Sequence, residues 1–463
     1  MSVATAHPGD WYTALVAGLL FPLHERLKGH DSHVRLRELE ASQWMEEARL
    51  EELQLQKLRR FLVAIDKTVP YYTARFSEVG FVPGDATSRA DLAKVPLLTK
   101  PLIRANVDRL KARGATKLIR YNTGGSSGEP LVFYMGPDRV SHDVAAKWRA
   151  TRWWGVDIGD PEIVVWGSPI ELGAQDRLRQ LRDRVLRTEL LPAFDMSERN
   201  LDRFVERIKT RRPKMVFGYP SALAYIAQHA ERRRQRLDGL GIRVAFVTSE
   251  CLYDHQRKQI ERTFGCPVAN GYGGRDAGFI AHECPMGSLH IAAEDLIVEL
   301  IDGDGQPVPA GQPGEIVVTH LATRDFPFVR YRTGDVGVMG DRTCACGRGL
   351  PTLREVQGRT TDFVVAKDGT VLHGLALIYV VRDLPGIRTF KIVQESLDRT
   401  RVSIVPEGGF DDRARITIRE GIQARLGRNV AVDVELVESI AAERSGKHRY
   451  VKSMVPIDGA QRA

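Results

Sequence analysis

Residues 214–248 read KMVFGYPSALAYIAQHAERRRQRLDGLGIRVAFVT. In this stretch a long amphipathic segment, 221–236, separates two short runs of apolar and β-branched residues, 214–217 and 243–248. This order predicts a strand, a covering helix and a second strand, the repeating unit of a parallel sheet. The alternation extends outward, with a further strand expected at 162–166 and a further helix at 200–211. We therefore predict an α/β main body.

The N-terminal 70 residues have helical periodicity instead. Pro70 closes a run in which four apolar residues recur at helical spacing: Leu55, Leu58, Leu62 and Ile65. We predict an N-terminal helical layer over residues 1–70. Its most apolar run, 14–23, is about half as long as a membrane-spanning helix. We expect a buried or interfacial helix there, and no segment that crosses a membrane.

The pattern changes twice toward the C-terminus. Two strand-like runs, 295–300 and 314–319, are joined by a glycine-containing turn, which predicts a β-rich subdomain. Residues 361–455 then alternate short strands with two helical stretches, enough for a compact α+β unit. We predict a large domain over residues 1–358 and a small domain over residues 359–463.

Composition limits the class of partner. The chain has 463 residues, of which 43% are hydrophobic and 27% are charged, a globular composition. Its formal net charge of +8 is too small for a histone-like protein but favours phosphorylated small molecules or an anionic membrane. We expect no nucleic-acid partner, because the sequence has no basic motif interleaved with aromatic residues. The oligomeric state stays open.

Two further features bear on location. An arginine-rich run over residues 177–187 leaves two interpretations open, a peripheral membrane contact and a solvated helix face. Five cysteines are too few for a disulfide framework in a chain of this length, and the N-terminus has no signal-like segment. We therefore expect a cytoplasmic protein.

A glycine- and hydroxyl-rich loop is the first candidate binding element. It lies between two strand-like runs and reads Thr123-Gly124-Gly125-Ser126-Ser127-Gly128. Glycines permit unusual backbone angles with exposed N–H groups, and the hydroxyls add donors, which together suit a polyphosphate. The alternative is a plain flexible turn.

Three more short motifs follow in the second half of the chain. Asp335, after the turn Arg332-Thr333-Gly334, can accept hydrogen bonds from a ribose diol, and Arg359 can support the same nucleotide. A third motif, Gly446-Lys447, lies near the C-terminus. The alternative interpretation is a surface turn and a solvated terminal lysine.

Taken together and in this order, these motifs resemble those of the adenylate-forming ligase superfamily. The likeness covers nearly the whole chain and is strongest to the phenylacetate-CoA ligase branch and its CapK-like members, which are associated with capsular polysaccharide synthesis. The stretches that carry it include 217–221, 248–250, 271–273, 330–335 and 445–451.

The resemblance implies a function and a set of site residues. It implies that ATP and Mg²⁺ convert a carboxylic acid to an acyl-adenylate, with Lys447 as the catalytic lysine of a mobile small domain and Asp362 as its hinge. It assigns the remaining roles as follows: the adenine pocket to Ser249, Glu250, Gly271, Tyr272 and Gly273, the carboxylate near Mg²⁺ to Asp276, and the ribose to Asp335 and Arg359. Asp276 departs from the Glu that is usual at its position.

The acyl acceptor has more than one candidate. Coenzyme A ranks first, because it is the acceptor of the resembled branch and a basic protein suits a polyphosphate thiol. However, residues 367–374 depart from the Arg/Asn-rich loop of phenylacetate-CoA ligases. An amine or a hydroxyl group is therefore an alternative acceptor. A non-catalytic nucleotide-binding protein is the alternative to an enzyme.

A separate metal site is predicted from spacing. His282 and Cys284 form one short pair, and Cys344 and Cys346 form a second pair 60 residues further on. Two such pairs on separate loops are typical of a structural, four-coordinate zinc site. The alternative is buried free thiols. The other histidines, among them His142 and His320, have no triad spacing, and we expect them to be ordinary surface or packed residues.

Overall fold

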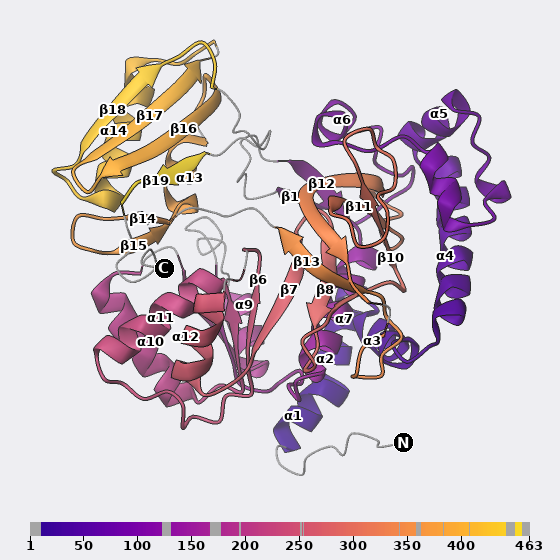
Figure 1. Ribbon diagram of the computed structural model, residues 1–463, viewed down its shortest axis with the longest axis horizontal. Coiled ribbons are helices and arrows are strands. Elements are labelled where there is room, and N and C mark those ends of the chain that lie inside the picture. The colour runs from indigo at the N-terminus through magenta and orange to yellow at the C-terminus, as the bar shows by residue number, and fades with distance from the viewer. Residues whose placement is uncertain are drawn as a thin grey trace.

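The structure is a computed structural model that describes residues 11–122, 131–166, 177–193, 196–250, 252, 254–341, 343–357, 363–382, 384–406, 408–440 and 450–455. Within them an eleven-stranded mixed sheet forms the main body, in the strand order β10-β11-β12-β13-β9-β8-β7-β6-β5-β3-β4. A separate four-stranded sheet belongs to the C-terminal part (Figure 1). The α/β class predicted from the sequence is confirmed.

One half of the large sheet is parallel. It contains β3 (Glu162–Trp166), β4 (Thr188–Pro192), β5 (Met215–Gly218), β6 (Val244–Thr248) and β7 (Val268–Gly274). Its strands are apolar on both faces because helices cover both. Val216 packs in the core with α10 (Glu198–Arg211), α11 (Pro220–Arg232) and α12 (Asp254–Phe264), whereas Phe217 packs on the other side with α7 (Pro137–Arg152). The strand at 162–166 is where the sequence predicted it.

The other half is antiparallel and begins where β7 turns back into β8. Its strands are β8 (Gly278–Glu283), β9 (Leu289–Ile291), β10 (Leu296–Ile301), β11 (Gly314–His320), β12 (Phe328–Met339) and β13 (Thr352–Gln357). The antiparallel β10–β11 pair confirms the predicted β-rich region.

N-terminal helices cover this antiparallel half. They include α3 (Ser32–Ser42), α4 (Glu47–Thr68), α5 (Pro70–Glu78) and α6 (Lys100–Ala105), followed by the β1 (Ile119–Asn122) and β2 (Val132–Met135) hairpin. Leu58, Leu62 and Ile65 are fully buried in the largest core, which confirms the helical periodicity, whereas Leu55, the first of the four predicted residues, is half-buried. Pro70 both ends α4 and starts α5, because proline is tolerated in the first turn of a helix.

A helical run precedes them at the N-terminus of the described chain. It consists of α1 (Trp11–Leu15), a π-helical turn (Val16–Leu20) and α2 (Phe21–Lys28), and it packs beside α9 (Arg177–Val185). Among the described residues, no helix combines the length and the apolar composition that crossing a bilayer requires.

The C-terminal part has its own core. Its strands are β14 (Phe363–Val365), β15 (Val371–His373), β16 (Ile387–Ser396), β17 (Arg399–Pro406), β18 (Ala431–Leu436) and β19 (Val451–Ser453), with helices α13 (Leu375–Arg382) and α14 (Asp412–Leu426). Residues of both helices and of the sheet pack together, among them Leu377, Ile392 and Ile418. The predicted boundary at 358/359 lies outside the described residues and stays a prediction.

Candidate active site

The parallel strands bring three short segments to one edge of the sheet. Because β5, β6 and β7 are parallel neighbours, the residues that follow each of them emerge side by side at the carboxyl edge. These residues are Tyr219 to Ser221 after β5, Ser249 and Glu250 after β6, and the end of β7 with the turn that follows it. Ligands of open α/β sheets bind at this edge, so the fold places the predicted adenine-pocket residues where a ligand site is expected.

A strained turn and a helix N-terminus define the middle of this edge. Ser249 has a φ of +74°, in the left-handed region that a non-glycine residue rarely adopts. The turn directs the chain so that the carboxylate of Glu250 accepts hydrogen bonds from the hydroxyl and the backbone N–H of Ser221. Ser221 lies in the first turn of α11, where a negative charge is favoured by the helix dipole.

The hairpin between β7 and β8 requires its glycines. A Cβ on Gly273 would lie 2.2 Å from the carbonyl oxygen of Gly278, so no side chain fits there. This close approach forms the tight turn that carries Asp276. The predicted glycine segment is thus needed for backbone packing as well as for any contact with a nucleotide.

A tyrosine hydroxyl holds each of the two predicted site carboxylates. Tyr331 donates to Asp276 Oδ2 at 2.6 Å, and Tyr272 donates to Asp335 Oδ2 at 3.1 Å. Burial raises the pKa of Tyr272 well above its usual range, with Asp335 and Asp276 adding to the effect, so Tyr272 stays a hydrogen-bond donor. Each predicted site carboxylate therefore accepts a hydrogen bond from a different tyrosine. Sequence reasoning missed the role of Tyr331, although it lies directly beside the Arg332-Thr333-Gly334-Asp335 motif.

Helix α7 contacts the turn between β7 and β8 and supports it. Arg139, which is 2% exposed, donates to the backbone carbonyl oxygens of Arg275 and Asp276 at 3.3 Å and forms an ion pair with Asp143 at 2.9 Å. Gly278 has a φ of +89°, and a Cβ there would lie 2.9 Å from His320 Nε2 and 3.0 Å from an Arg139 nitrogen. The turn, α7 and β11 are therefore packed without spare room.

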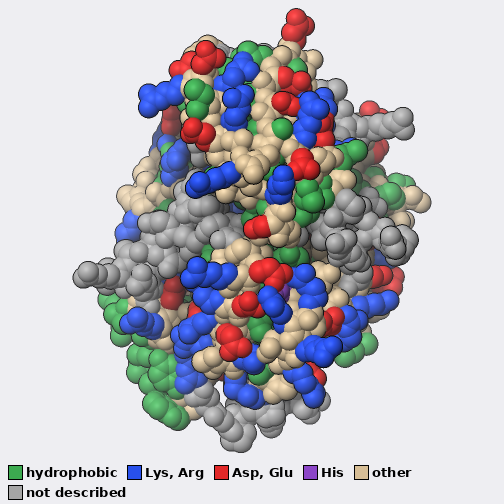
Figure 2. Space-filling view, turned by 90° about the vertical axis from the view of Figure 1, so that its left-hand side faces the viewer, with side chains coloured by type: hydrophobic (Ala, Val, Ile, Leu, Met, Phe, Trp, Pro, Cys, Tyr) green, Lys and Arg blue, Asp and Glu red, His purple; other side chains and the backbone are tan. Residues whose placement is uncertain are grey.

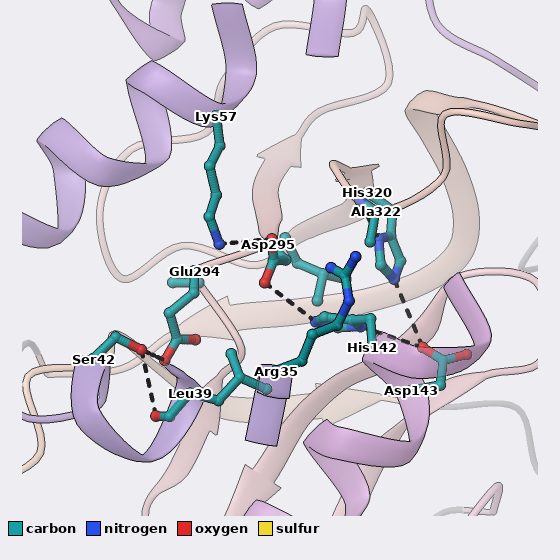
Figure 3. A network of polar contacts seen from close by, with 12 residues as sticks. Arg35, Leu39, Ser42, Lys57, His142, Asp143, Glu294, Asp295, His320 and Ala322 are labelled. Carbon is teal, nitrogen blue, oxygen red and sulfur yellow. Dashed lines mark hydrogen bonds and ion pairs between the residues drawn. The ribbon is translucent and has the colours of Figure 1, made fainter. Parts of the chain in front are cut away.

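A buried polar network extends from this contact (Figure 3). Asp143 faces both His142 and His320, and His142 Nε2 also lies 3.7 Å from Asp295, which Lys57 contacts at 2.8 Å. Burial opposes ionisation of Asp143, but Arg139 and the two histidines hold its pKa far below the usual range. Burial, with Arg139 and His142 nearby, lowers the pKa of His320 to about 3. Both histidines are packed, as expected, but the sequence had no signal that would place them around one carboxylate.

Several predicted site residues lie outside the described residues. They are Thr123, Gly124, Gly125, Ser126, Ser127, Gly128, Arg359, Asp362 and Lys447. The chain resumes at Tyr450, which packs edge-to-face against Phe390 at 4.9 Å between ring centroids. The next residues form β19, which pairs in parallel with β16.

The cysteines predicted to bind zinc converge, with a different histidine. Cys284, Cys344, Cys346 and His290 place one ligand atom each within 4.8 Å of all the others. Cys284 Sγ lies 3.7 Å from Cys344 Sγ, close to the separation of about 3.8 Å that tetrahedral zinc–thiolate bonds of about 2.3 Å require. Cys346 Sγ lies 3.2 Å from His290 Nε2. The donor set and its spacing fit Zn²⁺.

The prediction of His282 as the nitrogen ligand is corrected by this geometry. His282 pairs with His290 across β8 and β9, but its ring stacks on Phe279 at 5.3 Å and both of its nitrogens lack a described hydrogen-bond partner. His290 Nδ1 instead contacts the carbonyl oxygen of Leu350 at 2.9 Å, which leaves Nε2 free to bind a metal. Short sequence spacing favoured His282, whereas strand pairing brings His290 to the cysteines.

Family comparison agrees with the fold and with the motif order. A model of the AMP-binding enzyme family matches residues 190–322, and a model of the CapK C-terminal domain matches residues 364–454. Protein CapK of Staphylococcus aureus is 25% identical over 403 residues, which cover 86% of this chain and 88% of that protein. A phenylacetate-coenzyme A ligase of Thermus thermophilus is 25% identical over 422 residues, covering 88% and 91%.

Solved structures show the same architecture. A crystal structure of 2-hydroxyisobutyryl-CoA ligase in complex with 2-HIB-AMP and CoA superposes with a TM-score of 0.65 at 20% identity, covering 90% of this chain and 92% of that one. Together with the two family matches, this confirms the resemblance stated above. The chain therefore contains a segment that matches the AMP-binding enzyme family and one that matches the CapK C-terminal domain, and over most of its length it resembles adenylate-forming enzymes.

Proposed function

We propose that the protein activates a carboxylic acid with ATP as an acyl-adenylate and then transfers the acyl group, with coenzyme A ranked first as the acceptor. The observation that carries this proposal is the pair of carboxylates, Asp276 and Asp335, each held by a tyrosine hydroxyl beside the carboxyl edge of the parallel strands. A phenylacetate-coenzyme A ligase is among the relatives, and the superposed ligase structure contains an acyl-AMP and CoA. Both relatives support a carboxylic acid as the substrate and the thiol of coenzyme A as the acyl acceptor.

In the first half-reaction, adenylation of the acid, each proposed site residue has its own role. The acid's carboxylate oxygen attacks the α-phosphorus of ATP, and the bond to the β-phosphate oxygen breaks to release pyrophosphate. Asp335 accepts hydrogen bonds from the ribose diol, and Lys447 stabilises the charge that moves onto the phosphates. Asp276 is the carboxylate that would hold Mg²⁺, which neutralises phosphate charge when bound.

The second half-reaction transfers the acyl group. A nucleophile attacks the acyl carbon, and AMP leaves with the bonding electron pair. In the turn between β14 and β15, the carbonyl oxygen of Gly369 accepts a hydrogen bond from the Tyr225 hydroxyl of α11 at 3.4 Å. This turn belongs to the 367–374 segment that departs from phenylacetate-CoA ligases, so an amine or hydroxyl acceptor stays the alternative.

A two-stage assay tests the proposal. Pyrophosphate release is measured first with a broad panel of carboxylic acids; each active acid is then offered CoA, amino sugars and amino acids, with products identified by mass. Acyl-CoA is the expected product. An amide or ester without acyl-CoA would overturn the ranking of CoA. Nucleotide binding without pyrophosphate release for any acid would instead favour a non-catalytic binding protein.

We also propose that Cys284, Cys344, Cys346 and His290 hold one structural zinc ion. All four ligands come from the protein, so no position is left for a substrate. The zinc would join the turn after β8 to the loop before β13 and so stabilise the antiparallel half of the sheet. The proposal is independent of the catalytic assignment.

A further inference from the structure

The N-terminal helical run is apolar on two opposite sides. Its inner side is buried: Val16 and Phe21 are at most 5% exposed and share a core with Trp148 of α7. Its outer side carries large apolar residues every fourth position, between 37% and 81% exposed: Trp11, Leu15, Leu19, Leu23 and Leu27. An apolar side of a helix is normally covered, and here the described residues cover only the inner one.

The π-helical turn helps to keep these residues in one stripe. In an α-helix, residues four apart are offset by about 40° around the axis, so a long i, i+4 series drifts around the helix. The backbone N–H of Phe21 contacts the carbonyl oxygen of Val16, an i to i+5 contact with more residues per turn. Within Val16–Leu20 this wider turn offsets the drift. The stripe therefore extends over the 17 residues from Trp11 to Leu27, a rise of about 24 Å at 1.5 Å per residue.

The charged residues around the stripe are basic. Arg26 and Lys28 are exposed at its C-terminal end. Glu25, the one acidic residue of the run, is buried and contacts His24, His30 and Ser32 instead of solvent. An exposed surface that is apolar and basic with no exposed carboxylate of its own complements a surface that is apolar and anionic.

Helix α9 extends the same surface. The Tyr12 hydroxyl donates to the carbonyl oxygen of Val185 at 3.0 Å, and the Arg187 guanidinium lies over the Tyr12 ring at 4.2 Å. Leu181 is 59% exposed, and Asp183 is paired with Arg182. Figure 2 shows a group of hydrophobic side chains at the lower left, at the height that α1 and α2 have in Figure 1, with Lys and Arg side chains beside it.

We propose that this surface, the helical run Trp11–Lys28 with the adjoining α9, docks the protein peripherally on an anionic lipid bilayer. The helix would lie in the plane of the interface, with its leucines in the acyl boundary and its Arg and Lys side chains at the phosphates. A lipid surface is favoured over a protein partner because the exposed stripe presents no polar groups that would need directional hydrogen bonds.

Vesicle flotation with the full chain tests the proposal. One set of vesicles is phosphatidylcholine alone, and the other contains about a third phosphatidylglycerol, an anionic fraction large enough to give a negative surface potential. The protein should float with the anionic vesicles only. Leu19→Ser with Leu23→Ser should weaken binding by about tenfold or more, because two apolar contacts with the acyl region are lost. Arg26→Gln with Lys28→Gln should weaken it as well and reduce its salt dependence.

Controls separate docking from misfolding and from self-association. Met286→Ser with Ile416→Ser removes two other large apolar side chains of similar exposure, 58% and 51%, and should leave flotation unchanged. Melting temperature and pyrophosphate release are measured on every variant, so a catalytic failure is distinguishable from a docking failure. The proposal is overturned if the wild type does not float, if the control variant loses binding equally, or if light scattering shows a dimer that the stripe variant dissociates.

Discussion

At the scale of single residues, local geometry distinguishes chemically identical side chains. His282 and His290 face each other across neighbouring strands, yet only His290 has a carbonyl oxygen at its Nδ1 and a thiol at its Nε2. His282 is enclosed by aromatic rings, and burial lowers its pKa to about 3. The carbonyl oxygen at Nδ1 orients the His290 ring for binding a metal through Nε2. The His282 ring, which lies among phenylalanines, only fills space in the core.

Substitutions of the two histidines should therefore have different effects on zinc binding. Protein purified without added zinc should contain about one zinc per chain. His290→Ala, or Cys344→Ser with Cys346→Ser, should lose both the zinc and much of the stability, because metal binding is coupled to folding. The matched variant His282→Phe should keep its zinc. Metal analysis and thermal melting give the answer, and a stable, zinc-free wild type would contradict the assignment.

His320 predicts a pH dependence of stability. Its pKa is about 3 in the folded protein, against about 6.5 in the unfolded chain. Below pH 6.5 the unfolded chain binds a proton that the folded one does not, so this stabilisation, complete above that pH, is lost as pH falls toward 3. Asp143, Arg139 and His142 face the ring, and the backbone N–H of Ala322 donates to Nδ1.

The measurement is a pair of urea titrations at about pH 6 and pH 5. The wild-type unfolding free energy should fall over this interval, and His320→Gln should reduce that fall by about 1 kcal/mol, the contribution of one proton. An unchanged difference between the two pH values would show that His320 does not stay neutral in the folded protein.

At the scale of elements, α7 connects the core to the candidate site. Its residues Arg139 and Asp143 form an i, i+4 ion pair, and the arginine holds the turn between β7 and β8 by two carbonyl oxygens. The turn carries Asp276, whose side chain Tyr331 of β12 holds from another direction. Two elements far apart in the sequence therefore determine where one carboxylate lies.

Asp143→Asn should weaken this support. Removing one charge of a buried pair costs about 3 kcal/mol or more, and a displacement of Asp276 should slow pyrophosphate release by at least about tenfold. Asp138→Asn is the matched control on the same helix, because Asp138 pairs with Arg35 and Arg324 at the surface and its loss should cost less than about 1 kcal/mol. Equal effects of the two variants on release would remove Asp143 as a positioning residue.

At the scale of the whole molecule, the groups proposed to catalyse the reaction come from two separately packed sheets. The carboxylates lie on the large sheet, while Lys447 belongs to the chain that continues through Tyr450 into the smaller one. Small-domain rotation between half-reactions would let the lysine act in only one of them.

Lys447→Ala should therefore abolish adenylation, by about a hundredfold or more, and leave transfer from a supplied acyl-adenylate nearly intact. Lys452→Ala, five residues later and in β19, is the matched basic control and should affect neither step. Separate assays of pyrophosphate release and of product formation decide the matter. An equal loss in both assays would refute a role confined to adenylation.

The elements were predictable where their signal is local. The strands at 162–166 and 244–248 and the helix that buries Leu58, Leu62 and Ile65 follow from residue type and periodicity over a few turns. The convergence of Cys284 with Cys344 was also expected, because short ligand pairs are a local pattern. The partner histidine, the tyrosine at Asp276 and the contact of His320 with Asp143 were not predictable, because each contact joins residues separated by at least 50 positions.

The linear chain by itself determined the α/β class, the order of the motifs and the superfamily that these motifs resemble, because apolar periodicity and motif spacing are properties of the sequence. Only the tertiary structure decided that His290 rather than His282 joins the cysteines, that tyrosine hydroxyls hold Asp276 and Asp335, and that the described residues leave one side of the helical run Trp11–Lys28 uncovered. The physical reason is the same in each case. Strand register and helix packing set which side chains meet, and both are settled by the burial of the whole core rather than by neighbours in sequence.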